Sequence, residues 1–251
     1  MTDLHTHILP GIDDGALDLK TAIEIIEMEK EQRVFNVALT SHYDCEYMDF
    51  EVFRERRKES FDKVRRCKQV IKTNIHFKLG CEVQYSPRLL QMDIHPLCIE
   101  DTRLILLELP TMYRPQFLTE MLNYCQTEGI TPLIAHVERY SYVLECPQIL
   151  AEWIKMGAYA QINADTLLGK DRQVKMAFDF LRWGLVQVIA SDVHSLNRRP
   201  VRLEQAFHKV ENRLGKDVAY RLKKNANLLF SGEDLNDNTF HYPKRILGQW
   251  I

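Results

Sequence analysis

The chain alternates between short apolar runs rich in β-branched residues and longer stretches in which apolar positions recur at helical spacing. This alternation is typical of βα units, in which each strand is followed by a helix that crosses back over the sheet. Roughly 25 to 30 residues separate the runs, which leaves room for one crossover helix each and favours parallel strands. The pattern predicts seven strands, at residues 2–6, 34–41, 75–83, 103–109, 131–136, 158–163 and 186–191.

Helices are predicted in the intervening stretches. Asp18 is a candidate N-cap for a helix that reaches Gln32 and carries Ala22, Ile25 and Ile26 at helical spacing. Ser86 followed by Pro87 marks the start of a short helix. The remaining predicted helices span residues 50–72, 115–127, 148–156 and 170–183, and the last two end at glycines. Seven units of this kind predict a closed or nearly closed α/β barrel.

Length and composition agree with a barrel. The chain has 251 residues, of which 45% are hydrophobic and 27% charged, so neither disorder nor a miniature scaffold is expected. Barrels commonly form a single unit of about 250 residues. We therefore expect one domain that covers residues 1–251.

Charge and cysteine usage narrow the class of protein. With 33 Lys and Arg against 35 Asp and Glu, a net charge of -2 gives no general field for nucleic acid or an anionic membrane. No signal peptide and no run of eighteen apolar residues is present, so we expect a soluble, cytoplasmic protein without membrane insertion. Dispersed cysteines without a Cys-x-x-Cys pair predict reduced thiols at Cys45, Cys67, Cys81, Cys98, Cys125 and Cys146.

Candidate metal ligands stand where six of the seven predicted strands end. In a barrel of parallel strands these ends converge on one face, so residues far apart in sequence become neighbours. A single histidine or carboxylate is usually a surface or core group, but coincidence at six strand ends is not expected. Alternate residues on a strand face the same way, as in the His-x-His and Asp-x-His motifs. The candidates are His5, His7, His42, Glu82, Glu108, His136, Asp192 and His194, with Asp14 in a turn whose composition ordinary turn chemistry also explains.

The donor types suggest the metal and the reaction. Imidazoles and carboxylates without thiolates favour Mn, Fe or Zn over Ca or Mg. Nine groups are too many for one ion and suit two or three. Three divalent ions would exceed the charge of four carboxylates and one bridging hydroxide by about one, which would attract an anionic substrate. Metal-activated water is the nucleophile that hydrolysis of a phosphate ester needs.

With these residues in this order, the chain resembles the PHP (polymerase and histidinol phosphatase) superfamily of metal-dependent phosphoesterases. Residues 3–8 (DLHTHI), 12–15 (IDDG), 134–140 (IAHVERY) and 188–194 (VIASDVH) resemble its CpsB/CapC branch of bacterial protein-tyrosine phosphatases, which act in capsule and exopolysaccharide synthesis. The resemblance implies a distorted TIM-like (β/α)7 barrel of the PHP type and a three-ion cluster, most often Mn²⁺, with Fe or Zn as alternatives. It also implies a phosphotyrosine protein as substrate, namely the tyrosine-rich tail of a bacterial tyrosine kinase.

Residue roles follow from the same resemblance. Arg139 and Arg199 match positions that hold the phosphate, although Arg139 could instead pair with Glu138 on the surface, and Arg198 could take the place of Arg199. The implied ligand sets are His5, His7, Glu108 and Asp192 for one ion, Glu82, Glu108 and His136 for a second, and Asp14, His42 and His194 for a third.

The expected reaction is direct hydrolysis, in which a metal-bridging hydroxide attacks the phosphorus in line. A tyrosine leaving group, with a pKa of about 10, makes less demand on a general acid than a serine alkoxide. No cysteine is followed by arginine six positions later, which disfavours the cysteine-based phosphatase route.

Two alternatives to a tyrosine phosphatase stay open. The first is a small-molecule phosphatase such as histidinol-phosphate phosphatase, and the second is a catalytically weak scaffold that docks on a kinase through the basic stretch 54–66. Exposed aromatic residues after strands could recognise a tyrosine ring, and the segment 242–251 could pack on the barrel or on a neighbour. The aromatic candidates are Tyr43, Tyr47, Tyr113 and Tyr140.

Overall fold

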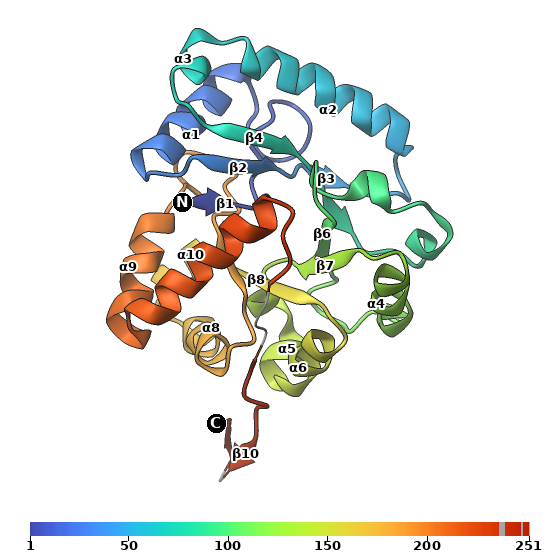
Figure 1. Ribbon diagram of the computed structural model, residues 1–251, viewed down its shortest axis with the longest axis vertical. Coiled ribbons are helices and arrows are strands. Elements are labelled where there is room, and N and C mark those ends of the chain that lie inside the picture. The colour runs from blue at the N-terminus through green and yellow to red at the C-terminus, as the bar shows by residue number, and fades with distance from the viewer. Residues whose placement is uncertain (236–238, 247, 251) are drawn as a thin grey trace.

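The computed structural model describes residues 1–235, 239–246 and 248–250 (Figure 1). Nine strands form two parallel sheets within these residues, ordered β1-β2-β4 and β3-β5-β6-β7-β8-β9. The strands are β1 (Thr2–Asp3), β2 (Asn36–Leu39), β3 (His42–Tyr43), β4 (His76–Leu79), β5 (Glu82–Gln84), β6 (Leu104–Glu108), β7 (Thr131–Ile134), β8 (Tyr159–Asn163) and β9 (Val188–Ala190).

A strand is found at each of the seven predicted positions, but one predicted strand is shortened and another is interrupted. The segment 34–41 contains only β2, which ends before Thr40, where the backbone N–H donates to the Thr6 carbonyl at 3.0 Å, and β3 begins after the segment. The segment 75–83 divides into β4 and β5 at Gly80. A Cβ at Gly80 would lie 2.9 Å from the Ile99 side chain, so the chain passes too close to Ile99 for a larger residue.

The first and last of these strands come together, so that the sheet curls round. Thr6 and Val193 form a parallel bridge, and the His7 N–H donates to the Val193 carbonyl at 3.0 Å. The Asp192 N–H donates to the His5 carbonyl at 2.9 Å. The result is an α/β fold built on a curled parallel sheet, with helices around its outside (Figure 1).

Ten helices surround the sheet within the described residues. They are α1 (Leu19–Glu31), α2 (Phe50–Arg65), α3 (Lys68–Ile71), α4 (Leu118–Thr127), α5 (Ser141–Glu145), α6 (Gln148–Lys155), α7 (Ala164–Leu168), α8 (Arg172–Trp183), α9 (Leu203–Leu214) and α10 (Lys216–Phe230). Short 3₁₀ turns lie at Pro87–Gln91, His95–Leu97 and Val137–Arg139.

The interior of the curled sheet is apolar and is closed at the amino ends of the strands. Leu104, Leu133 and Val188 belong to a buried cluster that also contains Ala226 and Phe230 of α10. In Figure 1, α10 lies across the sheet beside β1. Because α10 covers this end, the carboxyl ends of the strands are the end left open for a functional site.

The helix predictions are confirmed in part. Asp18 caps α1, accepting a hydrogen bond from the Thr21 N–H at 2.8 Å, and Ser86 caps the 3₁₀ turn after it. The single helix predicted over 50–72 is wrong, since Cys67 is extended and separates α2 from α3. The predicted start at Pro115 is also wrong: Phe117 adopts φ 60°, and α4 begins after it. Helices α9 and α10 were not predicted.

The C-terminal segment packs on the outside of the fold through its first part. The His241 N–H donates to the Trp183 carbonyl at 2.7 Å, and the Tyr242 hydroxyl donates to Glu152 at 2.7 Å. Beyond it, β10 (Arg245–Ile246) and β11 (Gln249–Trp250) form a hairpin that lies away from the sheet in Figure 1. Positions 247 and 251 of the predicted segment lie outside the described residues.

The six cysteines are free, as predicted, and four of them are buried. Burial raises the pKa of Cys81, Cys98 and Cys125 to about 12, so these thiols stay protonated at neutral pH. Among the described residues, no helix has both the length and the apolar character needed to cross a membrane.

Candidate metal centre

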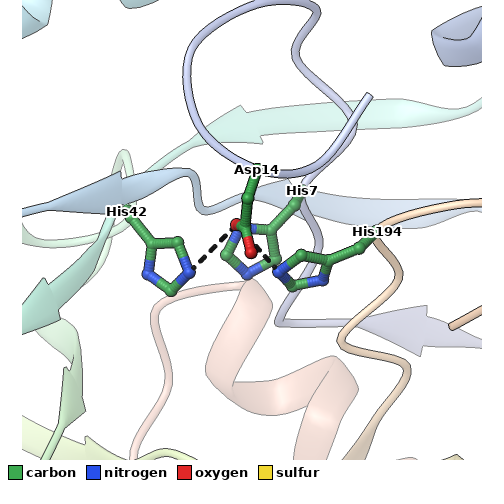
Figure 2. A group of neighbouring side chains, drawn as sticks. All are labelled: His7, Asp14, His42 and His194. Carbon is green, nitrogen blue, oxygen red and sulfur yellow. Dashed lines mark ion pairs between the residues drawn. The ribbon is translucent and has the colours of Figure 1, made fainter. Parts of the chain in front are cut away.

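The nine predicted metal ligands converge at the carboxyl ends of the strands. They fall into four overlapping groups, and within each group the donor atoms lie within 4.8 Å of one another. Figure 2 shows one group, in which His42 and His194 both point toward Asp14. The groups are His7, Asp14, His42 and His194; His5, His7 and Asp192; His5, Glu82 and His136; and His42, Glu82 and Glu108.

Glu82 is the central carboxylate of the cluster. Its Oε2 atom lies 3.0 Å from Nε2 of His5 and 3.2 Å from Nε2 of His7. Its Oε1 atom lies 2.9 Å from Nε2 of His136. Burial acts to raise the pKa of Glu82, but the neighbouring imidazoles outweigh burial and hold that pKa well below its usual range.

Glu108 has a more peripheral place than the resemblance implies. Its carboxylate lies 3.5 Å from Nε2 of His136 and 3.8 Å from Nδ1 of His42. It does not join the group of His5 and His7, which Asp192 completes, and Glu82 is the glutamate that is grouped with His5 and His136. The geometry therefore offers Glu82 as the carboxylate that could bridge ions.

Hydrogen bonds from outside the cluster fix the protonation of its two innermost imidazoles. Nδ1 of His7 lies 2.8 Å from the carboxylate of Asp13, and Nδ1 of His5 lies 3.2 Å from Oε1 of Gln161. Both partners are acceptors. The ionised carboxylate of Asp13 can only accept, and Oε1 of Gln161 already accepts the His136 N–H at 2.8 Å. In the neutral imidazole each Nδ1 therefore carries the proton, and Nε2 keeps the lone pair.

These lone pairs meet in the centre of the cluster. Nε2 of His5 and Nε2 of His7 are 3.1 Å apart. His194 repeats the pattern: its Nδ1 lies 2.9 Å from the Asp192 carbonyl, and its buried Nε2 has no hydrogen-bond partner although Asp14 lies 3.2 Å away. Lone pairs and carboxylate oxygens so placed repel one another unless a cation lies between them. The donor set therefore fits divalent metal ions.

The charges of the protein atoms alone also require a positive charge inside the cluster. Burial acts to lower the pKa of His7, yet its hydrogen bonds to Asp13, Asp192 and Glu82 raise that pKa well above the ordinary value. The buried carboxylates thus demand positive charge at this point, as a proton or as a metal ion. Protons and metal ions would compete for the same atoms.

Two residues of the cluster have left-handed backbones. His136 has φ 31° and Asp192 has φ 54°, conformations that cost energy in non-glycine residues and cluster at functional sites. Each lies two residues beyond the end of its strand, β7 or β9, and each side chain belongs to the cluster.

The turn before α1 also packs tightly against the cluster. A Cβ at Gly15 would lie 2.2 Å from the His7 carbonyl oxygen, so only glycine fits there. The Gly15 N–H donates to Asp13 at 3.0 Å, and the His42 N–H donates to the same carboxylate at 2.9 Å. Asp13 therefore ties the turn to both His7 and His42.

The predicted phosphate-binding arginines border an open hollow over the cluster. This hollow encloses about 410 Å³, and Arg139 and Arg199 line it together with Asp14, Glu108 and His136. Arg199 forms an ion pair with Asp192, and Nη1 of Arg139 lies 3.6 Å from the same carboxylate.

The two alternatives for these arginines do not match the geometry. Arg198 is exposed and does not line the hollow. Glu138 is buried and accepts the Asn163 N–H at 2.9 Å, so it is not a surface partner for Arg139. Of the four candidate tyrosines, Tyr43 and Tyr140 are buried and only Tyr47 and Tyr113 are exposed.

Three residues that support the cluster were not predicted as functional. Asp13 orients His7, as described above, and Gln161 orients His5. Gln161 also donates to Asn163 at 2.7 Å, and Asn163 donates to Asp192 at 2.6 Å. Gln161 and Asn163 alternate on β8, the one predicted strand that ends without a metal ligand. Two amides on one face of an apolar strand were the signal available in the sequence.

A curled parallel sheet with an imidazole and carboxylate cluster at the carboxyl ends of its strands defines an α/β protein of PHP-like fold. The family described as "Capsular polysaccharide synthesis, CpsB/CapC" matches residues 1–231, and the chain belongs to this family. The resemblance seen in the sequence motifs is therefore confirmed.

Named relatives support the assignment. The tyrosine-protein phosphatase YwqE of Bacillus subtilis strain 168 is 30% identical over 242 residues, which cover 94% of this chain and 93% of that protein. The tyrosine-protein phosphatase CpsB of Streptococcus pneumoniae is 32% identical over 235 residues, which cover 88% and 94%. A chain from the crystal structures of YwqE and CpsB, described as unique metal-dependent tyrosine phosphatases, superposes with a TM-score of 0.87. That chain is 26% identical, with 98% of this chain and 100% of that chain covered.

Proposed function

We propose that this protein is a metal-dependent protein-tyrosine phosphatase of capsule or exopolysaccharide synthesis. The observation that carries the proposal is the buried cluster of inward-facing imidazole lone pairs beneath a hollow bordered by two arginines. The names of its relatives support the same activity. The proposed substrate is a phosphotyrosine protein, and the proposed partner is the tyrosine-rich tail of a bacterial tyrosine kinase.

The proposed ligands are all nine predicted residues. Mn²⁺ is the proposed metal, in a cluster of up to three ions, with Fe and Zn as alternatives. Divalent ions bound there would lower the pKa of a coordinated water and offset negative charge on phosphate oxygens. The ligands are His5, His7, Asp14, His42, Glu82, Glu108, His136, Asp192 and His194.

The remaining steps belong to the protein's own side chains. Arg139 and Arg199 would hold the phosphoryl oxygens, for which a planar guanidinium is well suited. The hollow opens on the same side, so a tyrosyl phosphate can enter ring outward. No covalent phosphoenzyme is proposed, and the thiols of Cys81, Cys98 and Cys125, with a pKa of about 12, are poor nucleophiles.

We also propose that the chain is one domain and that its two sheets form one distorted seven-stranded barrel. The parallel bridge of Thr6 with Val193 supports closure between the first and last strands. The end of β2 before Thr40 and the interruption at Gly80 would account for the distortion.

The test measures phosphate release from a phosphotyrosine peptide, a phosphoserine peptide and histidinol phosphate, in metal-free buffer and with Mn²⁺. The wild-type protein is expected to act on phosphotyrosine only with Mn²⁺. His136→Ala should lower this rate at least about 100-fold, because it removes a proposed ligand that contacts Glu82. His208→Ala, on the exposed face of α9, is the matched control and should keep the wild-type rate.

Each other outcome has a definite meaning. Preference for histidinol phosphate would replace the tyrosine phosphatase with a small-molecule phosphatase that uses the same cluster. Metal binding without release from any substrate would favour a scaffold.

A further inference from the structure

A second hollow, between α8 and α9, has a strongly basic lining. It encloses about 730 Å³ and is bordered by the segment 169–171, one side of α8 and one side of α9. Two aspartates and five cations line it. The cations are Lys170, Lys175, Arg182, Lys209 and Arg213.

The two acidic residues do not neutralise this lining. Asp171 caps α8 by accepting the Val174 N–H at 3.2 Å, and Asp179 forms an ion pair with Arg182. In the part of the chain that the structure describes, no ion pair joins the other four cations to a carboxylate. The whole chain has a net charge of -2, so this concentration of unpaired positive charge is a local property of the surface.

The hollow combines this charge with an apolar floor. Val174 and Phe178 lie buried beneath it. The Arg213 guanidinium lies 4.4 Å from the centre of the Phe178 ring, a contact that orients the cation. The Lys209 ammonium donates to the Gly169 carbonyl at 3.3 Å, which ties α9 to the segment before α8.

The spread of the cations indicates the shape of the ligand. Lys175 and Arg182 are about two turns apart on α8, or roughly 10 Å along its axis. Lys209 and Arg213 are about one turn apart on α9, or roughly 6 Å. One compact anion would not reach all of them. An extended polypeptide advances about 3.3 Å per residue, so alternate acidic side chains recur about every 7 Å and can meet several.

The basic hollow is adjacent to the proposed active site along the chain and in space. A third hollow, of about 370 Å³, is lined by Arg139 and Arg199 and extends to Thr166 and Gln173. These two positions flank the segment 169–171 that lines the basic hollow. One loop between α7 and α8 therefore has the arginines of the active site on one side and the unpaired cations on the other.

We propose that the basic hollow between α8 and α9 binds an acidic segment of the phosphoprotein substrate while its phosphotyrosine lies at the metal centre. This proposal rests on the proposed phosphatase function. The hollow would act on substrate affinity, because none of its residues contacts the reacting phosphate.

The test compares two phosphotyrosine peptides and p-nitrophenyl phosphate. One peptide carries a run of acidic residues joined to the phosphotyrosine by a flexible linker, and the other carries a neutral run of the same length. The wild-type protein should show a KM about 3–10-fold lower for the acidic peptide, and added salt should remove the difference. Lys175→Glu, and Lys175→Glu with Lys209→Glu, should abolish the difference and leave kcat and the rate on p-nitrophenyl phosphate unchanged.

The control variant is Lys30→Glu with Lys63→Glu, which makes the same charge change on exposed positions of α1 and α2. It should keep the preference for the acidic peptide. An equal loss in this control, or no preference in the wild-type protein, would overturn the proposal. Fluorescence anisotropy of the unphosphorylated acidic peptide measures its binding to the protein independently of catalysis. Binding lost in the Lys175→Glu variant would support the hollow even if no substrate were hydrolysed.

Discussion

At the scale of single residues, the candidate metal ligands are oriented by acceptors that lie outside the cluster. Burial acts to raise the pKa of Asp13, but its hydrogen bond to His7 outweighs burial and lowers that pKa strongly. Asp13 therefore stays ionised and holds the Nδ1 proton of His7. Such outer partners typically contribute about 10–100-fold to metal affinity.

Asp13→Asn should weaken Mn²⁺ binding about 10–100-fold. The amide would keep the volume but replace the carboxylate that orients His7 and accepts the His42 N–H. Isothermal titration with Mn²⁺ measures the affinity directly, and circular dichroism checks the fold.

The matched control is Asp18→Asn, because asparagine caps a helix as well as aspartate does. It should bind Mn²⁺ as the wild-type protein does. Wild-type affinity in Asp13→Asn would show that the Asp13 carboxylate has no positioning role.

The convergence of the candidate ligands could be predicted from the sequence, and the residues that support them could not. His5, Glu82 and His136 were each expected at the end of a strand, and parallel strands bring such ends together without any knowledge of contacts. Asp13 and Gln161 act through particular neighbours, and only the packed turn and the register of β8 reveal these. The choice of Glu82 over Glu108 beside His5 depends in the same way on side-chain directions.

At the scale of elements, α1 packs on β1 through an unusual buried pair of acids. Glu29 of α1 is fully buried, and its side-chain neighbour is the carboxylate of Asp3. Burial, and then the charge of Asp3 on β1, raise the pKa of Glu29 well above its usual value, against the opposing N-terminal ammonium. The folded state therefore holds a proton that the unfolded chain releases.

Because the pKa of Glu29 is raised in the folded state, the Glu29→Gln variant should become more stable relative to the wild-type protein as the pH rises. The native protein binds more protons than the unfolded chain above the unfolded pKa of Glu29, so the free energy of unfolding falls with rising pH. Glutamine does not titrate, so the variant avoids this pH-dependent fall in the free energy of unfolding. Thermal denaturation should show Glu29→Gln gaining at least about 2–4 °C on the wild-type protein between pH 5 and pH 8.

Glu27→Gln, on the exposed face of α1, should show no such gain. A constant difference between Glu29→Gln and the wild-type protein at all pH values would mean that Glu29 is ionised in the folded state.

The elements that the sequence predicted well are those that burial specifies. Strands buried on both faces read as apolar runs, and all seven were found at the expected positions. Boundaries set by single backbone conformations were missed, as at Phe117 and Cys67.

At the scale of the whole molecule, the C-terminal segment stabilises the fold from outside. Residues 239–243 contact α6 and α8, and Gln148 donates to the Pro243 carbonyl at 3.3 Å. The family match ends at residue 231, before these contacts. None of the residues that make these contacts is a candidate metal ligand.

A chain shortened to residue 231 should therefore unfold at a lower temperature, by about 2–4 °C for each kcal/mol lost, and keep its Mn²⁺ affinity. A chain shortened to residue 243 should match the full chain in melting temperature and in Mn²⁺ affinity, because it retains the contacts with Trp183 and Glu152. Differential scanning calorimetry and metal titration measure the two properties. Equal melting temperatures for all three chains would show that the segment adds nothing to stability.

The order in which the ligands leave the ribosome has a consequence for biosynthesis. His5 is among the first residues made and His194 among the last of the cluster, and the two meet only when β1 and β9 pair. At about 5–20 residues per second, roughly 10–40 s separate their synthesis. Throughout that interval the early histidines have no partners from β9. The two donor groups that contain Asp192 or His194 can therefore form only after β9 has been made, whereas the two groups built on Glu82 need no residue from that part of the chain.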